Sequence, residues 1–262
     1  MMVRDEADVI EPVIRHLLNQ VDEVIVADNG STDGTREILP REELCVVLLD
    51  DADPAYYQSR KMTALAQLAF ERGHEWVVPC DADEIWYCPH ADTIAEWLGG
   101  MDDSFQFVHA ALFDHVATAE DPDEPNPLKR MGWRKRDPAP LPKVACRLRP
   151  DLVIEQGNHA AHVSGPERTM GGLVVRHFAY RSPEQFVRKA RNGAAAYALT
   201  DLPETMGMHW RGYGRILDNE GPEALQDVFR KWFWSREPRD DPSLIYDPAP
   251  VSAGAAIPMR DA

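Results

Sequence analysis

Long apolar runs, a secretion signal and basic residues are absent or scarce in this sequence. No run of about 18 apolar residues occurs, and the N-terminus does not show a basic stretch followed by an apolar one. We therefore expect a cytoplasmic protein without an integral membrane segment. Lys and Arg number 28 against 44 Asp and Glu, and the net charge of −16 argues against broad electrostatic binding to nucleic acid or anionic membranes. An anionic ligand would need a local cluster of basic residues or a bound cation.

Cysteine is scarce as well. The cysteines show no Cys-x-x-Cys spacing, which argues against a zinc site or a disulfide framework. We expect reduced and mostly buried thiols at Cys45, Cys80, Cys88 and Cys146. With 262 residues, of which 44% are hydrophobic, the chain can form one large α/β domain, alone or with a helical extension.

Two carboxylates follow the apolar stretch from Trp76 to Cys80, which is typical of a short buried strand. Asp81 and Asp83 are two residues apart, and alternate side chains of a strand point to the same face. Carboxylates placed side by side repel each other, and a divalent cation between them removes the repulsion. The pattern fits either a cation that holds the phosphates of a ligand or a solvated acidic turn.

Strands and helices are expected to alternate in the first third of the chain. Apolar residues recur at helical spacing from Val9 to Val21, with Asp8 as the expected N-cap. The other expected elements are strands at residues 24–27, 44–49 and 76–80, a helix from about 36 and a helix at 59–71. This alternation indicates parallel βαβ units. Asp28, Asp50 and Asp81 close three of the strands, and ligands bind at the carboxyl edge of such a sheet.

The second half of the chain shows further strands and a helical part. Strands are expected at residues 105–113, 143–148, 152–155 and 173–180. The Pro-rich connection over 117–142 is either a solvated linker or a flap over the site. Ser182, Pro183 and Gln185 predict the start of a helix. We divide the chain into a catalytic domain over 1–180, a helical extension over 181–240 and a flexible tail over 241–262.

Four motifs, taken in order, resemble those of bacterial family-2-type glycosyltransferases with the GT-A fold. They are Arg4-Asp5-Glu6-Ala7-Asp8, Asp28-Asn29-Gly30-Ser31-Thr32-Asp33-Gly34-Thr35, Ser59-Arg60-Lys61 and Asp81-Ala82-Asp83-Glu84. The resemblance implies a doubly wound, mostly parallel sheet with a C-terminal helical extension. It also implies transfer of a sugar from a UDP-, GDP- or dTDP-linked donor to a hydroxyl acceptor, with Mn²⁺ or Mg²⁺ and with inversion at the anomeric carbon.

The resemblance also assigns roles to residues. In that family, acidic residues of the first turn and of the second strand bind the base and ribose, and the Asp-x-Asp pair holds a metal ion on the diphosphate. By position, these roles fall to Asp5 or Glu6, to Asp28, and to Asp81 with Asp83, and the predicted nucleotide contacts also include Arg60 and Lys61.

His177 is the most informative histidine, because it lies just before the helix that carries Arg188 and Lys189. It resembles the late histidine that completes the cation site in some GT-A enzymes. We expect it to be the third metal ligand, with Arg188 and Lys189 on the diphosphate. The alternative is a structural histidine that donates to a backbone carbonyl, in which case His159 or His162 would be the third ligand.

The general base is expected at or beyond a strand end downstream of Asp83, and the candidates are Asp114, Glu155 and His159.

Two rival functions fit part of the pattern. A nucleotidyltransferase that makes sugar nucleotides would usually have a Gly-rich basic loop after the first strand, where this chain is acidic. A catalytically inactive nucleotide- or sugar-binding module is the other, although the chain retains both carboxylates of the pair. Only three residues precede Arg4, so either the true start lies upstream or the first strand is unusually short.

Overall fold

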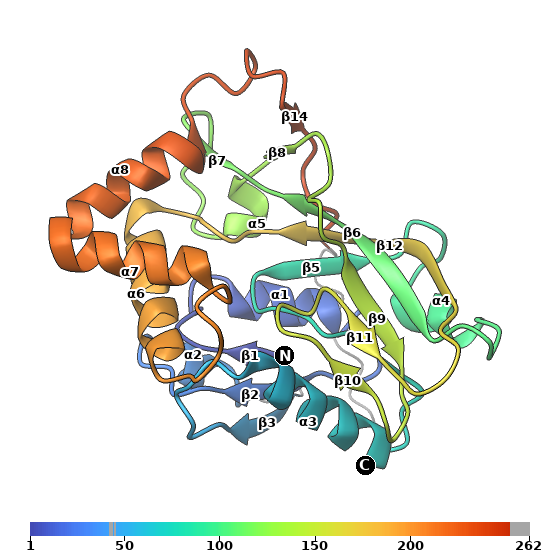
Figure 1. The fold of residues 1–262 in the computed structure, drawn as a ribbon. Helices are drawn as coiled ribbons and strands as arrows, with labels where there is room; N and C mark the ends of the chain where they lie inside the picture. The colour runs from blue at the N-terminus through green and yellow to red at the C-terminus, as the bar shows by residue number, and fades with distance from the viewer. Residues whose placement is uncertain (42–43, 45, 252–262) are drawn as a thin grey trace.

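A computed structural model describes residues 1–41, 44 and 46–251 (Figure 1). Cys45 and residues 252–262 of the predicted tail lie outside the described residues. Helices and strands alternate in the first part of the chain, which confirms the α/β class. None of the described helices is long and apolar enough to cross a membrane.

The first three strands form a parallel sheet, as their alternation with helices predicted. The strands are β1 (Met2–Val3), β2 (Ile25–Asp28) and β3 (Val47–Asp50), in that order. The helices that follow them are α1 (Ile10–Leu17), α2 (Thr35–Ile38) and α3 (Gln58–Glu71). Val3 lies beside Asp28, and Asp28 beside Asp50. The loops after these strands therefore meet at one edge of the sheet.

A second, mixed sheet has the strand order β4-β9-β6-β12-β5. Its strands are β4 (Trp76–Val77), β5 (Glu84–Tyr87), β6 (Phe107–Asp114), β9 (Lys143–Arg147) and β12 (Thr169–His177). Within it β6 and β12 are parallel, and the other neighbouring pairs are antiparallel. The strand predicted over 76–80 is shorter, because Pro79 has no N–H for a ladder hydrogen bond. Asp81 and Asp83 consequently lie in the turn between β4 and β5.

Short elements connect the long ones. They are α4 (Ile94–Gly99), β7 (Ala117–Thr118), α5 (Pro127–Arg130), β8 (Trp133–Lys135), β10 (Val153–Ile154) and β11 (Ala161–His162). The connection over 117–142 thus contains secondary structure. Its last part, residues 139–141, lines a cavity of about 570 Å³.

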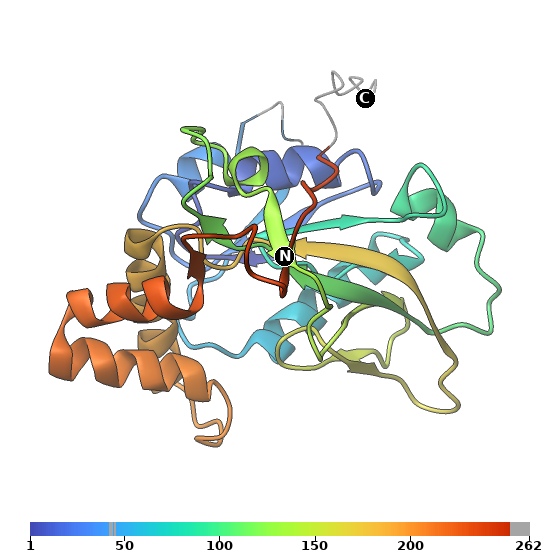
Figure 2. The ribbon, with the colours of Figure 1, turned by 90° about the horizontal axis from the view of Figure 1, so that it is seen from above.

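Three helices follow β12 and lie together on one side of the sheets (Figures 1 and 2). They are α6 (Pro183–Ala198), α7 (Met208–Glu220) and α8 (Pro222–Trp232). Ser182 caps α6 as predicted, since its Oγ accepts from the backbone N–H of Gln185 at 3.1 Å.

The chain then returns to the sheets. Strand β13 (Trp234–Ser235) pairs with β7, and β14 (Leu244–Tyr246) pairs with β8. Asp247 lies 2.7 Å from both Arg134 and Arg176. This corrects the flexible tail predicted from residue 241, because β14 and its ion pairs lie beyond that boundary.

The apolar face of α1 packs against β5, where Trp86 is fully buried. The residue before this helix is Val9, and Asp8 makes no cap, contrary to the prediction. Asp8 instead accepts from Arg181 Nε at 2.7 Å. The reason is that Arg181 is only 2% exposed, and a buried guanidinium needs carboxylate partners.

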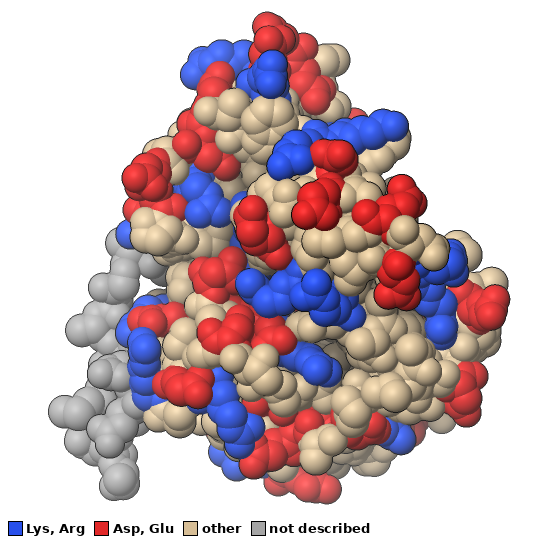
Figure 3. All heavy atoms as spheres, turned by 90° about the vertical axis from the view of Figure 1, so that its left-hand side faces the viewer, with Lys and Arg blue, Asp and Glu red and all other residues tan. Residues whose placement is uncertain are grey.

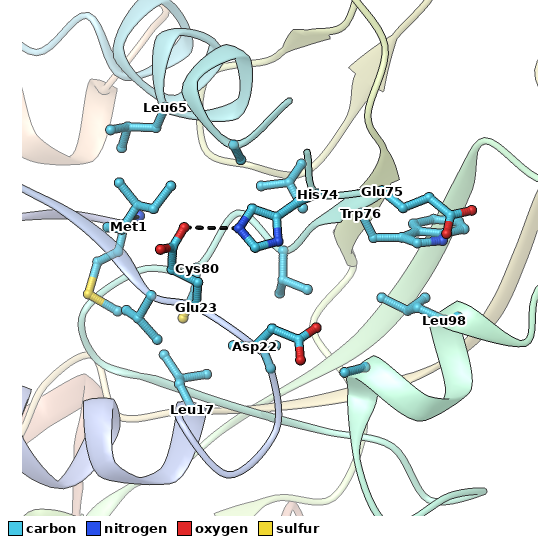
Figure 4. Close-up of a pocket in the computed structure, with 18 of the residues that line it drawn as sticks. Met1, Leu17, Asp22, Glu23, Leu65, His74, Glu75, Trp76, Cys80 and Leu98 are labelled. Carbon is cyan, nitrogen blue, oxygen red and sulfur yellow. Dashed lines mark hydrogen bonds and ion pairs between the residues drawn. The ribbon is translucent and has the colours of Figure 1, made fainter. Parts of the chain in front are cut away.

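A cavity of about 220 Å³ lies between the first sheet and β4 (Figure 4). Leu17, Leu65 and Leu98 are among the mostly apolar residues that line it. Two polar residues of its lining, His74 and Glu23, pair with each other, since His74 Nε2 and Glu23 Oε2 lie 2.9 Å apart. The volume is below the roughly 300–1,000 Å³ of most ligand pockets, which does not favour this cavity as the functional site.

His115 is a buried histidine just after β6. Its Nδ1–H donates to the carbonyl oxygen of Met131 at 2.7 Å, and its ring stacks on Phe178. Burial lowers the pKa of His115 to about 3. In the unfolded chain this histidine takes up a proton near pH 6.5. The stability that its neutral form provides is therefore complete above pH 6.5 and is lost as the pH falls from 6.5 toward 3.

We predict that His115→Asn weakens this acid sensitivity, because the amide can still donate to Met131 but does not titrate. Between pH 6.5 and pH 5, the free energy of unfolding should fall by about 2 kcal/mol less than in the unsubstituted protein. Urea unfolding at both pH values measures the difference. The exposed His90 supplies the control, His90→Asn, and the buried His16 remains in all three proteins. Parallel pH profiles for His115→Asn and the unsubstituted protein would contradict the prediction.

Candidate active site

A cavity of about 570 Å³ lies at the carboxyl edge of β1, between the β4–β5 turn, the end of β12 and α6. Its volume is typical of ligand sites, which span roughly 300–1,000 Å³. The titratable side chains that line it include Arg4, Asp5, Glu6, Asp81, Asp83, Asp114, Lys143, His159, His177, Lys189 and His209. On the face seen in Figure 3, basic and acidic side chains are interspersed. Despite the net charge of −16, this face is not uniformly acidic.

Asp83 is almost completely enclosed, with 2% of the residue exposed. Lys189 donates to its Oδ2, and His177 Nε2 lies 3.6 Å from its Oδ1. Arg181 Nη1 lies 3.9 Å from Oδ2. Burial alone would raise the pKa of Asp83, but these positive charges overcome burial and lower it. Asp83 is therefore an ionised, buried carboxylate whose charge is compensated from β12 and α6.

His177 faces Asp83 from the end of β12. Its Nδ1–H donates to Asp114 Oδ1 at 2.7 Å, which leaves Nε2 on the side of Asp83. Burial would lower the pKa of His177, but the carboxylates of Asp83 and Asp114 raise it to about 9. The ring thus donates to a carboxylate and lines the cavity, where a purely structural histidine would donate to a backbone carbonyl.

A different set of residues holds Asp81. Its Oδ1 accepts from Gln58 and Asn158, each at 3.0 Å, and its Oδ2 accepts from Lys143 at 2.6 Å. Lys143 also lies 2.8 Å from Glu84 and is 3% exposed, so one buried lysine compensates two carboxylates. The prediction of one shared face for the two Asp residues is corrected. They lie in a turn, and each carboxylate has a lysine of its own.

The first turn is joined to α6 through both of its acidic residues. Asp5 has a φ of 55°, in the left-handed region that non-glycine residues rarely adopt. Its Oδ1 accepts from the N–H of Thr32 and its Oδ2 from Asn192, each at 2.6 Å. Glu6 lies 3.0 Å from Lys189 Nζ and accepts from Arg181. Both predicted first-turn residues therefore line the cavity, and neither carboxylate is free.

Asp28, expected to bind the base or ribose, does not line the cavity. Its carboxylate has no exposed surface. It accepts from Arg36 Nη1 at 2.8 Å and from the N–H of Ser31 at 3.2 Å. In this structure Asp28 shapes the second loop, and a nucleotide would reach it only if Arg36 moved.

Three basic residues predicted to contact the nucleotide also lie outside the cavity lining. Arg60 and Lys61 pair with Asp53 and Asp51 of the loop after β3. Arg188 lies 3.6 and 3.9 Å from carboxylates of the first and second loops. These three basic side chains stabilise the loops around the site, because each lies close to a carboxylate of those loops.

The candidate bases differ in their surroundings. His159 lines the cavity, and its Nδ1–H donates to the carbonyl of Pro142 at 2.9 Å, which leaves Nε2 available. Burial and the charge of Lys143 lower the pKa of His159, so the ring is neutral at pH 7. Glu155 and His162 pair with each other at 2.6 Å on the exposed β10–β11 hairpin, outside the cavity lining.

Asp114 also lines the cavity, but one of its oxygens accepts from His177. Burial would raise the pKa of Asp114, and the hydrogen bond and charge of His177 overcome burial and lower it. A carboxylate with a lowered pKa is a poor proton acceptor, so Asp114 is better suited to orienting His177.

Asp83 and His177 offer two donors to a divalent cation. Their facing atoms, Oδ1 and Nε2, lie 3.6 Å apart, a separation that two ligands of one ion can have. When Nε2 loses its proton, the hydrogen bond to Asp114 keeps the remaining proton on Nδ1, as a carboxylate commonly does for a metal-binding histidine. No group of three or more His, Cys, Asp or Glu side chains in the described chain could hold a metal. An ion held by this pair would have to take its remaining ligands from water or from a bound molecule.

Some residues of the site were not anticipated from the sequence, namely Arg181, Lys143, Gln58 and Asn158. Hydropathy patterns assign charged residues to the surface, whereas Arg181 and Lys143 are buried. Gly157 and Asn158 have φ of 89° and 59°, and this Gly-Asn pair is a recognisable turn signal. That signal could have placed the loop, but not its contact with Asp81.

Residues 1–104 match Glycosyl transferase family 2, and this stretch contains the first turn, the second loop and the β4–β5 turn. No curated protein matches the chain.

Solved structures with similarity include S. aureus TarS 1-349 in complex with UDP. The two sequences are 14% identical, the match covers 84% of this chain and 71% of the TarS chain, and the TM-score is 0.38. For a second structure, S. aureus TarS, the identity is 14%, the match covers 83% of this chain and 43% of the TarS chain, and the TM-score is 0.35. The match of residues 1–104 to Glycosyl transferase family 2 bears out the resemblance carried by the four motifs, all of which lie in this stretch.

Proposed function

We propose that the protein transfers a sugar from a nucleoside diphosphate donor to a hydroxyl acceptor, with Mn²⁺ or Mg²⁺ as cofactor. The observation that carries the proposal is the pair of Asp83 and His177 beside Lys189, in a cavity of about 570 Å³ at the carboxyl edge of β1. A nucleoside diphosphate needs positive charge around its phosphates and polar groups around its base and ribose. The cavity offers both kinds of group.

Asp83 and His177 are the residues that would hold the cation, with Asp81 close by in the same turn. When bound, the ion would supply positive charge that stabilises the leaving diphosphate. Lys189, which contacts both Glu6 and Asp83, places a second positive charge at the same point. His177 would have to lose its Nε2 proton to bind the ion, and the hydrogen bond from its Nδ1–H to Asp114 would then keep the neutral ring in the tautomer that presents Nε2.

His159 is the proposed general base. A single displacement at the anomeric carbon inverts its configuration and requires one group to take the proton of the acceptor hydroxyl. His159 has a free Nε2 in the cavity and is neutral at pH 7. Asp114 is committed to His177, and Glu155 lies outside the cavity lining.

Calorimetric titration with UDP, GDP and dTDP, each with and without MnCl₂, tests this function. Binding of one of them that MnCl₂ strengthens, followed by release of the same diphosphate from its sugar nucleotides, would support the proposal. Product analysis then identifies the sugar and the configuration of the new bond. If none of the three binds in the presence of MnCl₂, the proposal is contradicted.

We predict that Asp83→Asn abolishes the strengthening of nucleotide binding by MnCl₂, because the substitution removes the charge that holds the cation. It should also lower the free energy of unfolding by on the order of 3 kcal/mol, since Lys189, Arg181 and His177 lose a buried partner. Circular dichroism confirms that the variant is folded, and calorimetry measures binding. The matched control is Asp227→Asn in α8, where the side chain is 77% exposed. Undiminished Mn²⁺-dependent binding by folded Asp83→Asn would exclude this site.

His159→Gln is predicted to lower kcat by about 10²- to 10⁴-fold while the affinity for the nucleoside diphosphate changes little. The rate of the unsubstituted protein should fall below pH 6.5, where His159 becomes protonated, and the variant should lack this acid limb. Glu155→Gln should keep the activity. Retained activity in His159→Gln together with a loss in Asp114→Asn, at saturating MnCl₂, would transfer the role of base to Asp114.

A further inference from the structure

The acidic side chains that line the larger cavity are already satisfied within the protein. Asp83 and Glu6 share Lys189, and Asp81 pairs with Lys143. Asp114 accepts from His177, and Asp5 accepts from Thr32 and Asn192. Both lysines of the cavity are in turn committed to carboxylates. The positive charge of Lys143 and Lys189 therefore balances acids of the protein before any substrate binds.

Arg4 is different. It lines the cavity and is partly buried, yet it has no ion pair and no side-chain hydrogen bond with any described residue. Its Nε is enclosed and lacks a partner. The neighbouring carboxylates of Asp5 and Glu6 do not pair with it, because other donors occupy them. A buried donor without a partner is unfavourable, and an incoming acceptor removes that cost.

We infer that Arg4 binds the diphosphate of the donor, because its guanidinium lines the cavity and is not paired with any described residue. This inference rests on the proposed function. A guanidinium presents a planar fork of N–H donors that matches two phosphate oxygens, and its charge strengthens each bond. Arg4 directly follows β1, and two residues later Glu6 contacts Lys189, which in turn contacts Asp83. Arg4 therefore lies in the same turn as the residue that links the first strand to the proposed cation site.

The test compares Arg4→Gln, Arg4→Lys and the unsubstituted protein, using whichever of UDP, GDP and dTDP binds most tightly with MnCl₂. Arg4→Gln should weaken binding by about 10- to 100-fold, because a charged hydrogen-bonded contact is lost. Arg4→Lys should recover part of the affinity, since it keeps the charge but not the fork. The affinity of the unsubstituted protein should also fall more steeply with salt than that of Arg4→Gln. Arg15→Gln, on the solvent side of α1, is the control of equal charge change.

Without ligand, the melting temperature of Arg4→Gln should be unchanged or higher, because an unpartnered buried donor has been removed. A lower melting temperature combined with unchanged affinity would show a structural role and overturn the inference. An equal loss of affinity for the diphosphate and for the corresponding nucleoside would also overturn it, since Arg4 would then contact the base or ribose. If the unsubstituted protein binds none of the three diphosphates, the proposed function itself fails. Binding by the unsubstituted protein with no effect of Arg4→Gln refutes the role of Arg4 alone.

Discussion

The site depends on one interaction, the pairing of buried Asp83 with positive charges from β12 and α6. An ionised carboxylate that is 2% exposed is stable only when nearby charges and donors replace its hydration. Lys189, His177 and Arg181 provide those charges, although they lie far from Asp83 in the sequence. The same helix also binds the first turn, through Glu6 and Asn192. Helix α6 is consequently part of the candidate active site.

The parallel part of the fold and the acidic edge could be predicted from the sequence, because both follow from local patterns. Alternating strands and helices bring the loops after β1, β2 and β3 to one edge whatever the rest of the chain does. Asp83 and Glu6 were assigned from motifs at that edge, and His177 and Lys189 from a strand end followed by a capped helix. All four line the cavity. The positions of these four residues at the cavity could therefore be predicted from the sequence, although their hydrogen-bond and ion-pair partners could not.

The partners could not be predicted, because an ion pair depends on which charges the fold brings together. Asp28 carries the expected motif, yet Arg36 and Ser31 occupy its carboxylate. Arg188 is one residue from Lys189, but the helix turns it toward the first and second loops and away from the cavity. The β4–β5 turn is a similar case. Pro79 ends the ladder early, so Asp81 and Asp83 leave the strand pattern from which a shared face was expected.

The two lysines that line the cavity, Lys143 and Lys189, differ in how far their side chains are exposed. Lys143 has a side chain that is 4% exposed and is enclosed by Asp81, Glu84 and the carbonyl of Gly157. Removing it from these carboxylates would leave buried charges uncompensated. Lys189 has a side chain that is 22% exposed and faces the cavity beside His177. A cation held by Asp83 would compete with Lys189 for the same carboxylate, and the ammonium group would then be free to contact a phosphate. If this protein binds both, cation and diphosphate would therefore favour each other's binding, because the cation would free the Lys189 ammonium group to contact a phosphate.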